Sequence, residues 1–210
     1  MKPAALGFRM HSGWGVVVAL SRVAGKLDVV ERRRIVVIDP QSPGAKQPYH
    51  FAENLELVKA EKFLADHTAM TGRIAVAAVE QLIVDLRSRE YDVVASAVVL
   101  ASGRTLPEVP KILASHALIH AAEGECYRQA ILKACEIIPI PVIGVRERDL
   151  EEWLRAAFGK DTARITNEIS AAGRKLGPPW TQDHKGAASA ALLALKLHNT
   201  DASILQASAT

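Results

Sequence analysis

The first 39 residues alternate between short apolar runs and turn-forming residues. Mainly apolar runs at Ala5–Met10, Trp14–Leu20 and Leu27–Asp39 are typical of β-strands. Gly25 can adopt the positive φ that a turn between the second and third runs requires. Pro40 ends the third run, because proline has no N–H to donate to a strand ladder. The pattern therefore predicts an antiparallel meander of three strands.

Helical periodicity dominates the remainder of the chain, interrupted by two further apolar strands at Tyr91–Ser102 and Val142–Val145. Both follow long helical segments, which is typical of parallel strands covered on both faces. The predicted helices are residues 52–89, with a bend or division at Thr71-Gly72, then 111–138, 149–158, 162–175 and 181–198.

This order of elements predicts an α/β fold with a five-stranded mixed sheet, three strands antiparallel and two parallel, and helices on both faces. The chain has 210 residues, 49% of them hydrophobic, which is enough for a substantial core. Because no repeat or linker divides the sequence, we expect a single domain over residues 1–210. Its small, polar end, residues 199–210, is expected to fray.

Charge and cysteine content narrow the function classes. The net charge is +3, but residues 1–50 hold eight Lys/Arg against three Asp/Glu. This basic segment either meets an acidic partner or forms a solvated strand face. Arg32 and Arg34 share one face of their predicted strand and Arg33 takes the other.

The expected location is cytoplasmic. Cys126 and Cys135 lie on one predicted helix, too far apart along its axis to pair, and free thiols suggest a reducing compartment. We find neither a signal-peptide pattern nor an apolar run of the ~18–20 residues that span a membrane.

Ionisable residues follow one stripe of the predicted helix 111–138. At 100° per residue, His116, His120, Glu123 and Tyr127 fall on one side, together with apolar residues that face the core. Such groups are either paired in a buried network or line a cleft. His116 and His120, four residues apart, can also share a metal ion, with Glu123 one turn on.

The segment that begins the last predicted helix, Thr181 to Gly186, holds a second set of candidates. Thr181 suits the N-cap, and Asp183 complements the helix dipole. Capping alone explains both residues, yet Asp183 is in phase with Ala187 and so leans toward the sheet. We find no P-loop, Rossmann fingerprint or paired CxxC, so no cofactor is expected beyond the divalent metal that the histidines allow.

The chain resembles the RuvC-type Holliday-junction resolvases of the ribonuclease H-like superfamily. Residues 6–9 with 13–17 look like that family's first strand, glycine turn and second strand, and residues 183–191 look like its last helix. Residues 164–175 resemble the helix that precedes it. The resemblance implies the ribonuclease H-like fold.

The resemblance also implies a nuclease site of four carboxylate positions that hold two divalent metals. Here Arg9 stands at the first position, the strand Val93–Leu100 carries no acid, and Gly186 replaces one of the closing pair, so that Asp183 alone matches. We therefore expect the standard resolvase activity to be absent.

Three hypotheses remain. The first is a nucleic-acid-associated protein without the two-metal activity, binding weakly and non-specifically. The second is a hydrolase, metal-dependent or not, with a relocated site. The third is a homo-oligomer, such as a homodimer, of unknown ligand. The binding candidates are Arg9, Arg32, Arg34, His184 and Lys185; the candidates for the relocated site are His116, His120, Glu123 and Asp183.

The helix phases also make a geometric prediction. His116, His120 and Glu123 should meet Arg9 and Asp183 around one cavity at the carboxyl edge of the sheet. Arg9 should then pair with Glu123 or with Asp183, because a charge on a central strand needs a partner or solvent.

Overall fold

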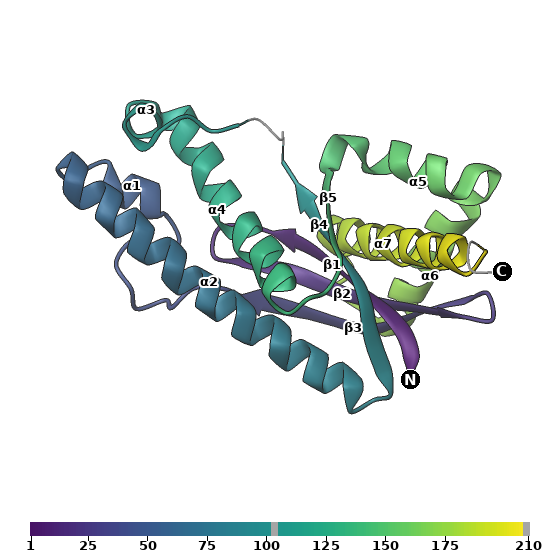
Figure 1. Cartoon of the computed structure of the whole chain (residues 1–210). Coiled ribbons are helices and arrows are strands. Elements are labelled where there is room, and N and C mark those ends of the chain that lie inside the picture. The colour runs from purple at the N-terminus through teal and green to yellow at the C-terminus, as the bar shows by residue number, and fades with distance from the viewer. Residues whose placement is uncertain (102–104, 208–210) are drawn as a thin grey trace.

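The computed structural model describes residues 1–101 and 105–207, with side chains up to residue 200. Its strands form one five-stranded mixed sheet in the order β3-β2-β1-β4-β5 (Figure 1). The strands β1 (Lys2–Met10), β2 (Trp14–Val23) and β3 (Lys26–Val36) pair antiparallel, and β4 (Tyr91–Leu100) and β5 (Val142–Arg146) continue the sheet parallel to β1. The predicted α/β fold with three antiparallel and two parallel strands is confirmed.

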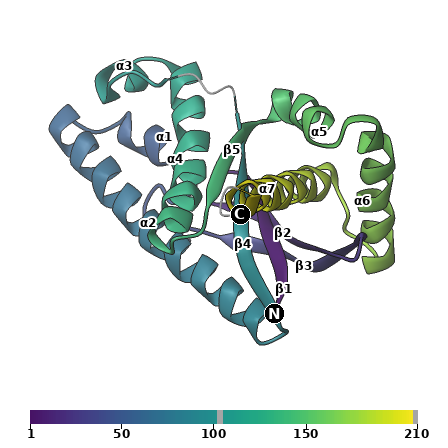
Figure 2. The same ribbon diagram turned by 45° about the vertical axis from the view of Figure 1, so that its right-hand side comes forward.

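Helices cover both faces of this sheet (Figures 1 and 2). The core beneath α2 and α4 includes Phe8 of β1, whereas Ala5, on the opposite side of the same strand, packs against α7. α5 and α6 lie on the α7 side. These helices are α2 (Leu57–Arg87), α4 (His116–Ile137), α5 (Leu150–Phe158), α6 (Thr162–Leu176) and α7 (Gln182–Ala207).

Two short helices, α1 (Pro48–Ala52) and α3 (Val109–Leu113), lie against the first turns of α4. There Ile119 of α4 packs with Ile112 of α3 in a small apolar cluster, while later turns of α4 join the core beneath the sheet. The first turns of α4 thus extend past the sheet (Figure 1). Two 3-10 turns, Glu147–Asp149 and Gly159–Asp161, flank α5.

Close packing of α7 on β1 depends on one glycine. A Cβ atom on Gly7 would lie 1.8 Å from the carbonyl oxygen of Ala187, so only glycine allows the helix to approach so closely. The facing surface of α7 is made of small residues, including Ala187 and Ala191, which are fully buried. This contact brings the start of α7 next to Arg9, two residues beyond Gly7 on the same face of β1.

Several boundaries differ from the sequence-based predictions. The long helix α2 begins at Leu57 and runs through Thr71-Gly72 without division, preceded by the separate α1. The helix predicted over 111–138 is divided at Ser115, whose extended backbone starts α4 afresh. Helix α7 continues past His198 to Ala207, and the end of the tail expected to fray, residues 208–210, lies outside the described residues. Among the described helices, none is both long and apolar enough to cross a membrane.

Candidate functional site

At the carboxyl end of β1, an arginine joins two acidic side chains. The Nε of Arg9 donates to Asp183 Oδ1 at 2.7 Å, and its Nη1 lies 2.8 Å from Glu147 Oε1. His11 Nε2 lies 3.0 Å from the other oxygen of Asp183. Arg9, His11, Glu147 and Asp183 are called the arginine-centred site below. The expected pairing of Arg9 with Asp183 is thus present.

These contacts fix the charges of the arginine-centred site. Partial burial would raise the pKa of Asp183, but hydrogen bonds from His11 and Arg9 outweigh it and hold that pKa below its usual value. Burial likewise opposes the charge on Arg9, yet Glu147 and Asp183 raise the pKa of its guanidinium. Asp183 is therefore an anion whose two oxygens are both engaged by protein donors.

A row of stacked groups leads from this site to the surface. The rings of His11 and Trp14 stack with centroids 4.6 Å apart and 24° between their planes. The guanidinium carbon of Arg34, an exposed residue, lies 4.1 Å from the centre of a Trp14 ring, the geometry of a cation–π contact. Arg34, Trp14 and His11 thus form one connected surface next to Asp183.

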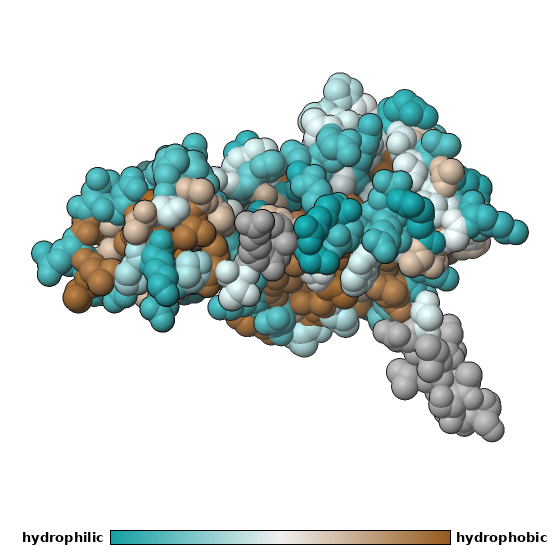
Figure 3. Space-filling model, turned by 90° about the horizontal axis from the view of Figure 1, so that it is seen from above, coloured by the Kyte–Doolittle hydropathy of each residue, from teal (hydrophilic) through white to brown (hydrophobic). Residues whose placement is uncertain are grey.

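A cavity of about 930 Å³ opens beside Arg9, between α5, α6 and α7. Four cationic side chains and two acidic ones line it: Arg9, Arg155, Lys160 and Lys185, with Glu147 and Glu151. Seen from above, the surface on the α5 and α6 side is mostly hydrophilic, whereas hydrophobic residues gather more at the opposite end (Figure 3). With four cationic and two acidic side chains in its lining, the cavity carries an excess of positive charge.

Two small or apolar residues lie next to Arg9, one on the neighbouring strand and one on α7. Val99 of β4 pairs in register with Arg9, is 4% exposed, and packs on the α7 side of the sheet. Gly186 faces Arg9 from α7, because a Cβ atom built there would meet only Arg9 Cδ, at 3.8 Å. Neither Val99 nor Gly186 offers a ligand atom, so the carboxylates in contact with Arg9 are those of Asp183 and Glu147.

Two other binding candidates serve the structure instead. Arg32 donates through Nη1 to the backbone carbonyls of Gly177 and Pro179, in the loop before α7. His184 is 8% exposed, and its Nδ1 accepts hydrogen bonds from the backbone N–H of Thr181 at 3.1 Å and the Thr181 hydroxyl at 2.8 Å. Both side chains hold the start of α7 in place.

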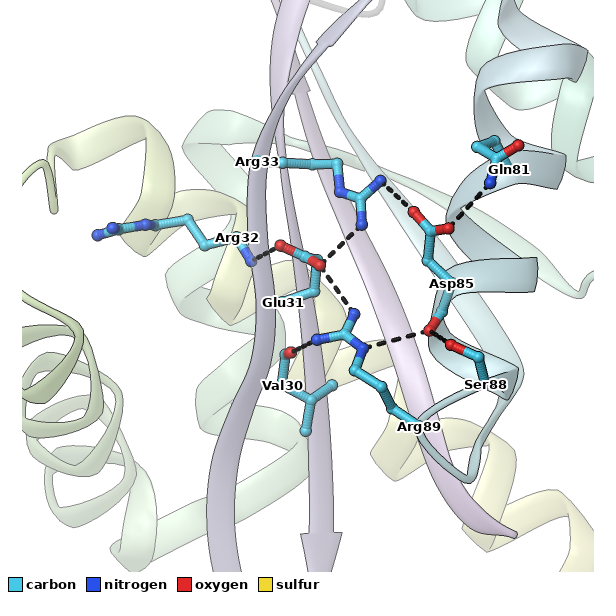
Figure 4. Close-up of polar contacts among 8 residues, drawn as sticks. All are labelled: Val30, Glu31, Arg32, Arg33, Gln81, Asp85, Ser88 and Arg89. Atoms are coloured by element: carbon cyan, nitrogen blue, oxygen red, sulfur yellow. Dashed lines mark hydrogen bonds and ion pairs between the residues drawn. The ribbon is translucent and has the colours of Figure 1, made fainter.

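Most of the basic cluster on β3 is also engaged (Figure 4). Arg33 lies 2.7 Å from Asp85 of α2 and 2.8 Å from Glu31, and Arg89 lies 2.8 Å from the same Glu31 oxygen. As predicted, Arg33 faces one side of the sheet and Arg32 the other. Of the arginines at positions 32–34, Arg34 is therefore the one presented to solvent.

A second group of ionisable residues lies where α1 meets α4. His50, His116 and His120 each offer a ring nitrogen, and these three nitrogens lie within 4.8 Å of one another. The Nε2 atoms of His116 and His120 are 3.0 Å apart. These three residues, with Glu123 beneath them, are called the histidine cluster below.

Glu123 supports this cluster from the protein interior. It is 2% exposed, and its Oε1 accepts from His50 twice: from the ring Nδ1 at 2.8 Å and from the backbone N–H at 3.2 Å. Tyr127, one turn further along α4, donates to the carbonyl of Ala45 at 2.7 Å and so ties the segment before α1 to the same helix. Burial raises the pKa of Tyr127 far above its usual value, so the phenol remains a donor.

The predicted single cavity does not form. Arg9 pairs with Asp183 and Glu147 on the α7 face, whereas Glu123 pairs with His50 and belongs to the α4 side. Glu123 and Tyr127 are buried as expected, but His116 and His120 are exposed, because the start of α4 extends past the sheet. The sequence candidates thus divide between two sites.

Sequence reasoning missed three members of these sites. His50 lies at a predicted loop–helix boundary, 66 residues before His116, and only Pro48, a helix-starting residue, marked the helix that carries it. His11 lies between the first two predicted strands, and Glu147 follows a predicted strand. Tertiary packing alone brings His11 to Asp183 and Glu147 to Arg9. Periodicity within one helix cannot identify such partners.

The sequence matches no protein-family model and no curated protein. Among solved structures, one of Thermus thermophilus RuvC has a TM-score of 0.50 at 13% identity, covering 94% of this chain and 96% of that one. T. thermophilus RuvC in complex with a Holliday junction substrate has a TM-score of 0.49 at 11% identity, covering 94% and 95%. An Aquifex aeolicus member of the Ppx/GppA family has a TM-score of 0.36 at 9% identity over 77% of this chain and 40% of that one.

At such low identity these likenesses concern the fold. The described sheet, with three antiparallel and two parallel strands and helices on both faces, matches the ribonuclease H-like fold of RuvC. The predicted relationship to that fold is supported. The chemistry of the chain has to be argued from its own residues.

Proposed function

We propose that this chain is a nucleic-acid-binding protein of ribonuclease H-like fold that lacks two-metal nuclease chemistry. The observation that carries the proposal is the guanidinium of Arg9, held between Asp183 and Glu147 at the carboxyl edge of the sheet. Its position is the one where the resemblance implies the first metal-binding carboxylate. A cation that already neutralises two acids thus stands where the resemblance implies a metal-binding acid.

Two divalent metal ions do not fit the residues present. Mg²⁺ is held by carboxylate and other oxygens, and a two-metal site needs several of them. Asp183 already has both oxygens engaged, and Val99 and Gly186 offer no ligand. A guanidinium about 4 Å from a divalent ion would also repel it by about 8 kcal/mol at an effective dielectric constant of 20.

The same surroundings suit a phosphate group. Arg9, Arg155, Lys160 and Lys185 line the adjoining cavity, and basic side chains supply most non-specific affinity for nucleic acids. Trp14 contacts Arg34 and His11, and an unpaired base can stack on its indole in place of the exposed Arg34 guanidinium. A phosphodiester strand could therefore lie along the opening of the cavity, with its charge toward the lysines.

Binding is expected to be modest. Arg32, Arg33 and His184 are engaged within the protein, which leaves few groups for phosphate contacts. Non-specific affinities of this kind are about 10⁻⁴–10⁻⁶ M near physiological salt and weaken as salt rises. That one structural neighbour was solved with a Holliday junction makes branched DNA a reasonable substrate to include.

Fluorescence anisotropy with labelled single-stranded, duplex and four-way-junction DNA tests the proposal. Between about 50 and 200 mM salt we expect the affinity to fall at least tenfold, because a few phosphate contacts release counterions. Lys185→Ala and Trp14→Ala should each weaken binding severalfold. Lys59→Ala is the control. Lys59 lies in the first turn of α2 and is 73% exposed, and its replacement should leave the affinity unchanged. Affinity that is independent of salt would contradict the proposal.

Incubation of a four-way junction with the protein and Mg²⁺ tests the absence of nuclease activity. No cleavage is expected. Cutting that requires Mg²⁺ and disappears in Asp183→Asn would show that Asp183 still serves as a metal ligand and that the proposal is wrong.

The alternative hydrolase needs His116, His120, Glu123 and Asp183 at one place. Asp183 is bound to Arg9 and His11 on the α7 side, and the other three gather around His50 on the α4 side. A site of all four residues is not formed. The histidine cluster therefore requires its own explanation.

A further inference from the structure

We infer that His50, His116 and His120 form a binding site for a transition-metal ion of the Zn²⁺ class, with Glu123 as the residue that positions His50. The inference is independent of nucleic-acid binding, because the two sites share no residue. It rests on the ring geometry, on the buried carboxylate and on the access of solvent to the cluster.

The ring nitrogens are spaced almost as zinc requires. Imidazole nitrogens bind Zn²⁺ at about 2.0–2.1 Å, so two of them at a tetrahedral angle lie about 3.3 Å apart. The Nε2 atoms of His116 and His120 are 3.0 Å apart, close to that value. The third nitrogen, within 4.8 Å of both, comes from His50, whose short helix α1 is tied to α4 chiefly through Glu123 and Tyr127.

Glu123 determines which nitrogen of His50 can bind a metal. A carboxylate only accepts hydrogen bonds, so the contact of 2.8 Å places the ring proton on His50 Nδ1. Nε2 is then unprotonated and presents a lone pair. Metal-binding histidines commonly donate their other N–H to a carboxylate in this way, which orients the ring and raises its basicity.

The kind of metal follows from the ligands. Three imidazoles favour Zn²⁺, Cu²⁺ or Ni²⁺ over Mg²⁺ and Ca²⁺, which prefer oxygen. Three protein ligands leave a fourth tetrahedral position for water or an exogenous ligand, as in catalytic rather than structural zinc sites. His116 and His120 are exposed, so an ion reaches the cluster without unfolding of the chain.

Isothermal titration of the metal-free full chain with ZnCl₂ tests the inference. One Zn²⁺ per chain is expected, with no comparable binding of MgCl₂. His116→Ala and His120→Ala should each weaken Zn²⁺ binding at least tenfold. Both side chains are exposed, so these variants are expected to fold. His198→Ala, outside both sites, is the matched control and should bind as the unmodified protein does.

Two further measurements distinguish a specific metal site from adventitious metal binding. Co²⁺ in place of Zn²⁺ should give the intense visible absorption of a tetrahedral site, lost in His50→Ala. Glu123→Gln should weaken Zn²⁺ binding by about 10–100-fold while the cobalt spectrum keeps its tetrahedral form, the pattern of a positioning residue. Zn²⁺ binding that is absent, or equally affected by His198→Ala, would overturn the inference.

Discussion

The arginine-centred site and the histidine cluster are carried by helices on opposite sides of the sheet, α7 and α4, and are built in opposite ways. In the arginine-centred site, Arg9 stands between two acids and the charges satisfy one another. In the histidine cluster, Glu123 is buried behind three imidazoles that each offer a nitrogen within 4.8 Å of the others, and the Nε2 atoms of His116 and His120 are in contact at 3.0 Å. The first arrangement neutralises its acids, and the second leaves metal-binding atoms available.

The difference shows that packing on one sheet can give two groups of ionisable side chains very different surroundings. At the α7 face, tight packing against β1 brings the acid of Asp183 within hydrogen-bonding distance of Arg9. Past the end of the sheet, the short helices α1 and α3 pack on the start of α4, and its exposed histidine rings gather there outside the core. Perturbing each region separately tests this contrast.

The largest effect is expected from Gly7→Ala. Its Cβ would meet the backbone of α7 at 1.8 Å, a contact that the helix can relieve only by moving away from β1. We expect the free energy of unfolding to fall by about 3 kcal/mol, the upper end for overpacked cores. Chemical denaturation measures the loss.

Gly72→Ala is the matched control for that change. Gly72 lies within α2, and a Cβ atom built there meets nothing within 4 Å. It should stabilise the protein by about 0.5–1 kcal/mol, because alanine is the better helix former. Equal effects at the two glycines would contradict the role assigned to Gly7.

Arg9→Ala comes next. It removes the donor shared by Asp183 and Glu147, and we expect a loss of about 2 kcal/mol, less than for a fully buried pair because the Arg9 side chain is 21% exposed. The double variant Arg9→Ala/Asp183→Ala should cost clearly less than the sum of the two single changes. Strict additivity would show that the pair does not act as a unit.

Glu123→Gln should cost about 1 kcal/mol in metal-free protein. The amide oxygen can still accept from His50, so what is lost is the charge-assisted part of the hydrogen bond. The comparison variant is Glu136→Gln, an exposed residue near the end of α4, which should change stability by less than about 0.5 kcal/mol. A loss of about 3–5 kcal/mol would instead indicate that Glu123 has a buried ionic partner, which the substitution leaves unpaired.

The smallest effect concerns acid sensitivity. The pKa of Asp183 is lowered in the folded state, so its contribution to stability is fully present above the unfolded value of about 3.9 and is lost as the pH falls through the lower, folded value. The unmodified protein should therefore be more stable than Asp183→Asn near neutral pH, and this difference in the free energy of unfolding should shrink between about pH 5 and pH 2. Thermal unfolding of both proteins across this pH range measures the difference in stability. A difference that stays constant would contradict the prediction.

The sequence predicted the sheet because its signals are local. β-branched runs bounded by glycine and proline identify strands wherever they lie, and the phase of Asp183 against Ala187 indicated which way the carboxylate leans. Arg9 and Asp183 could be paired because both the central strand and the last helix were recognisable. That part of the candidate site followed from periodicity and topology together.

The rest of the site could not be predicted, because helix phase gives a direction and not an environment. His116 and His120 lie on the same side of α4 as Glu123. They belong to the first turns of the helix, which extend past the sheet, and are therefore exposed. The partner of Glu123 proved to be His50 on a separate short helix. Only the packed chain shows how far a helix extends past its sheet.

The position of Trp14 gives the protein an optical reporter. Its indole contacts both the guanidinium of Arg34 and the ring of His11, which in turn contacts Asp183. Any ligand that draws Arg34 away or changes the protonation of His11 alters the quenching of indole emission. With Trp153 and Trp180 replaced by phenylalanine, fluorescence from Trp14 alone would follow events at the arginine-centred site without an added dye.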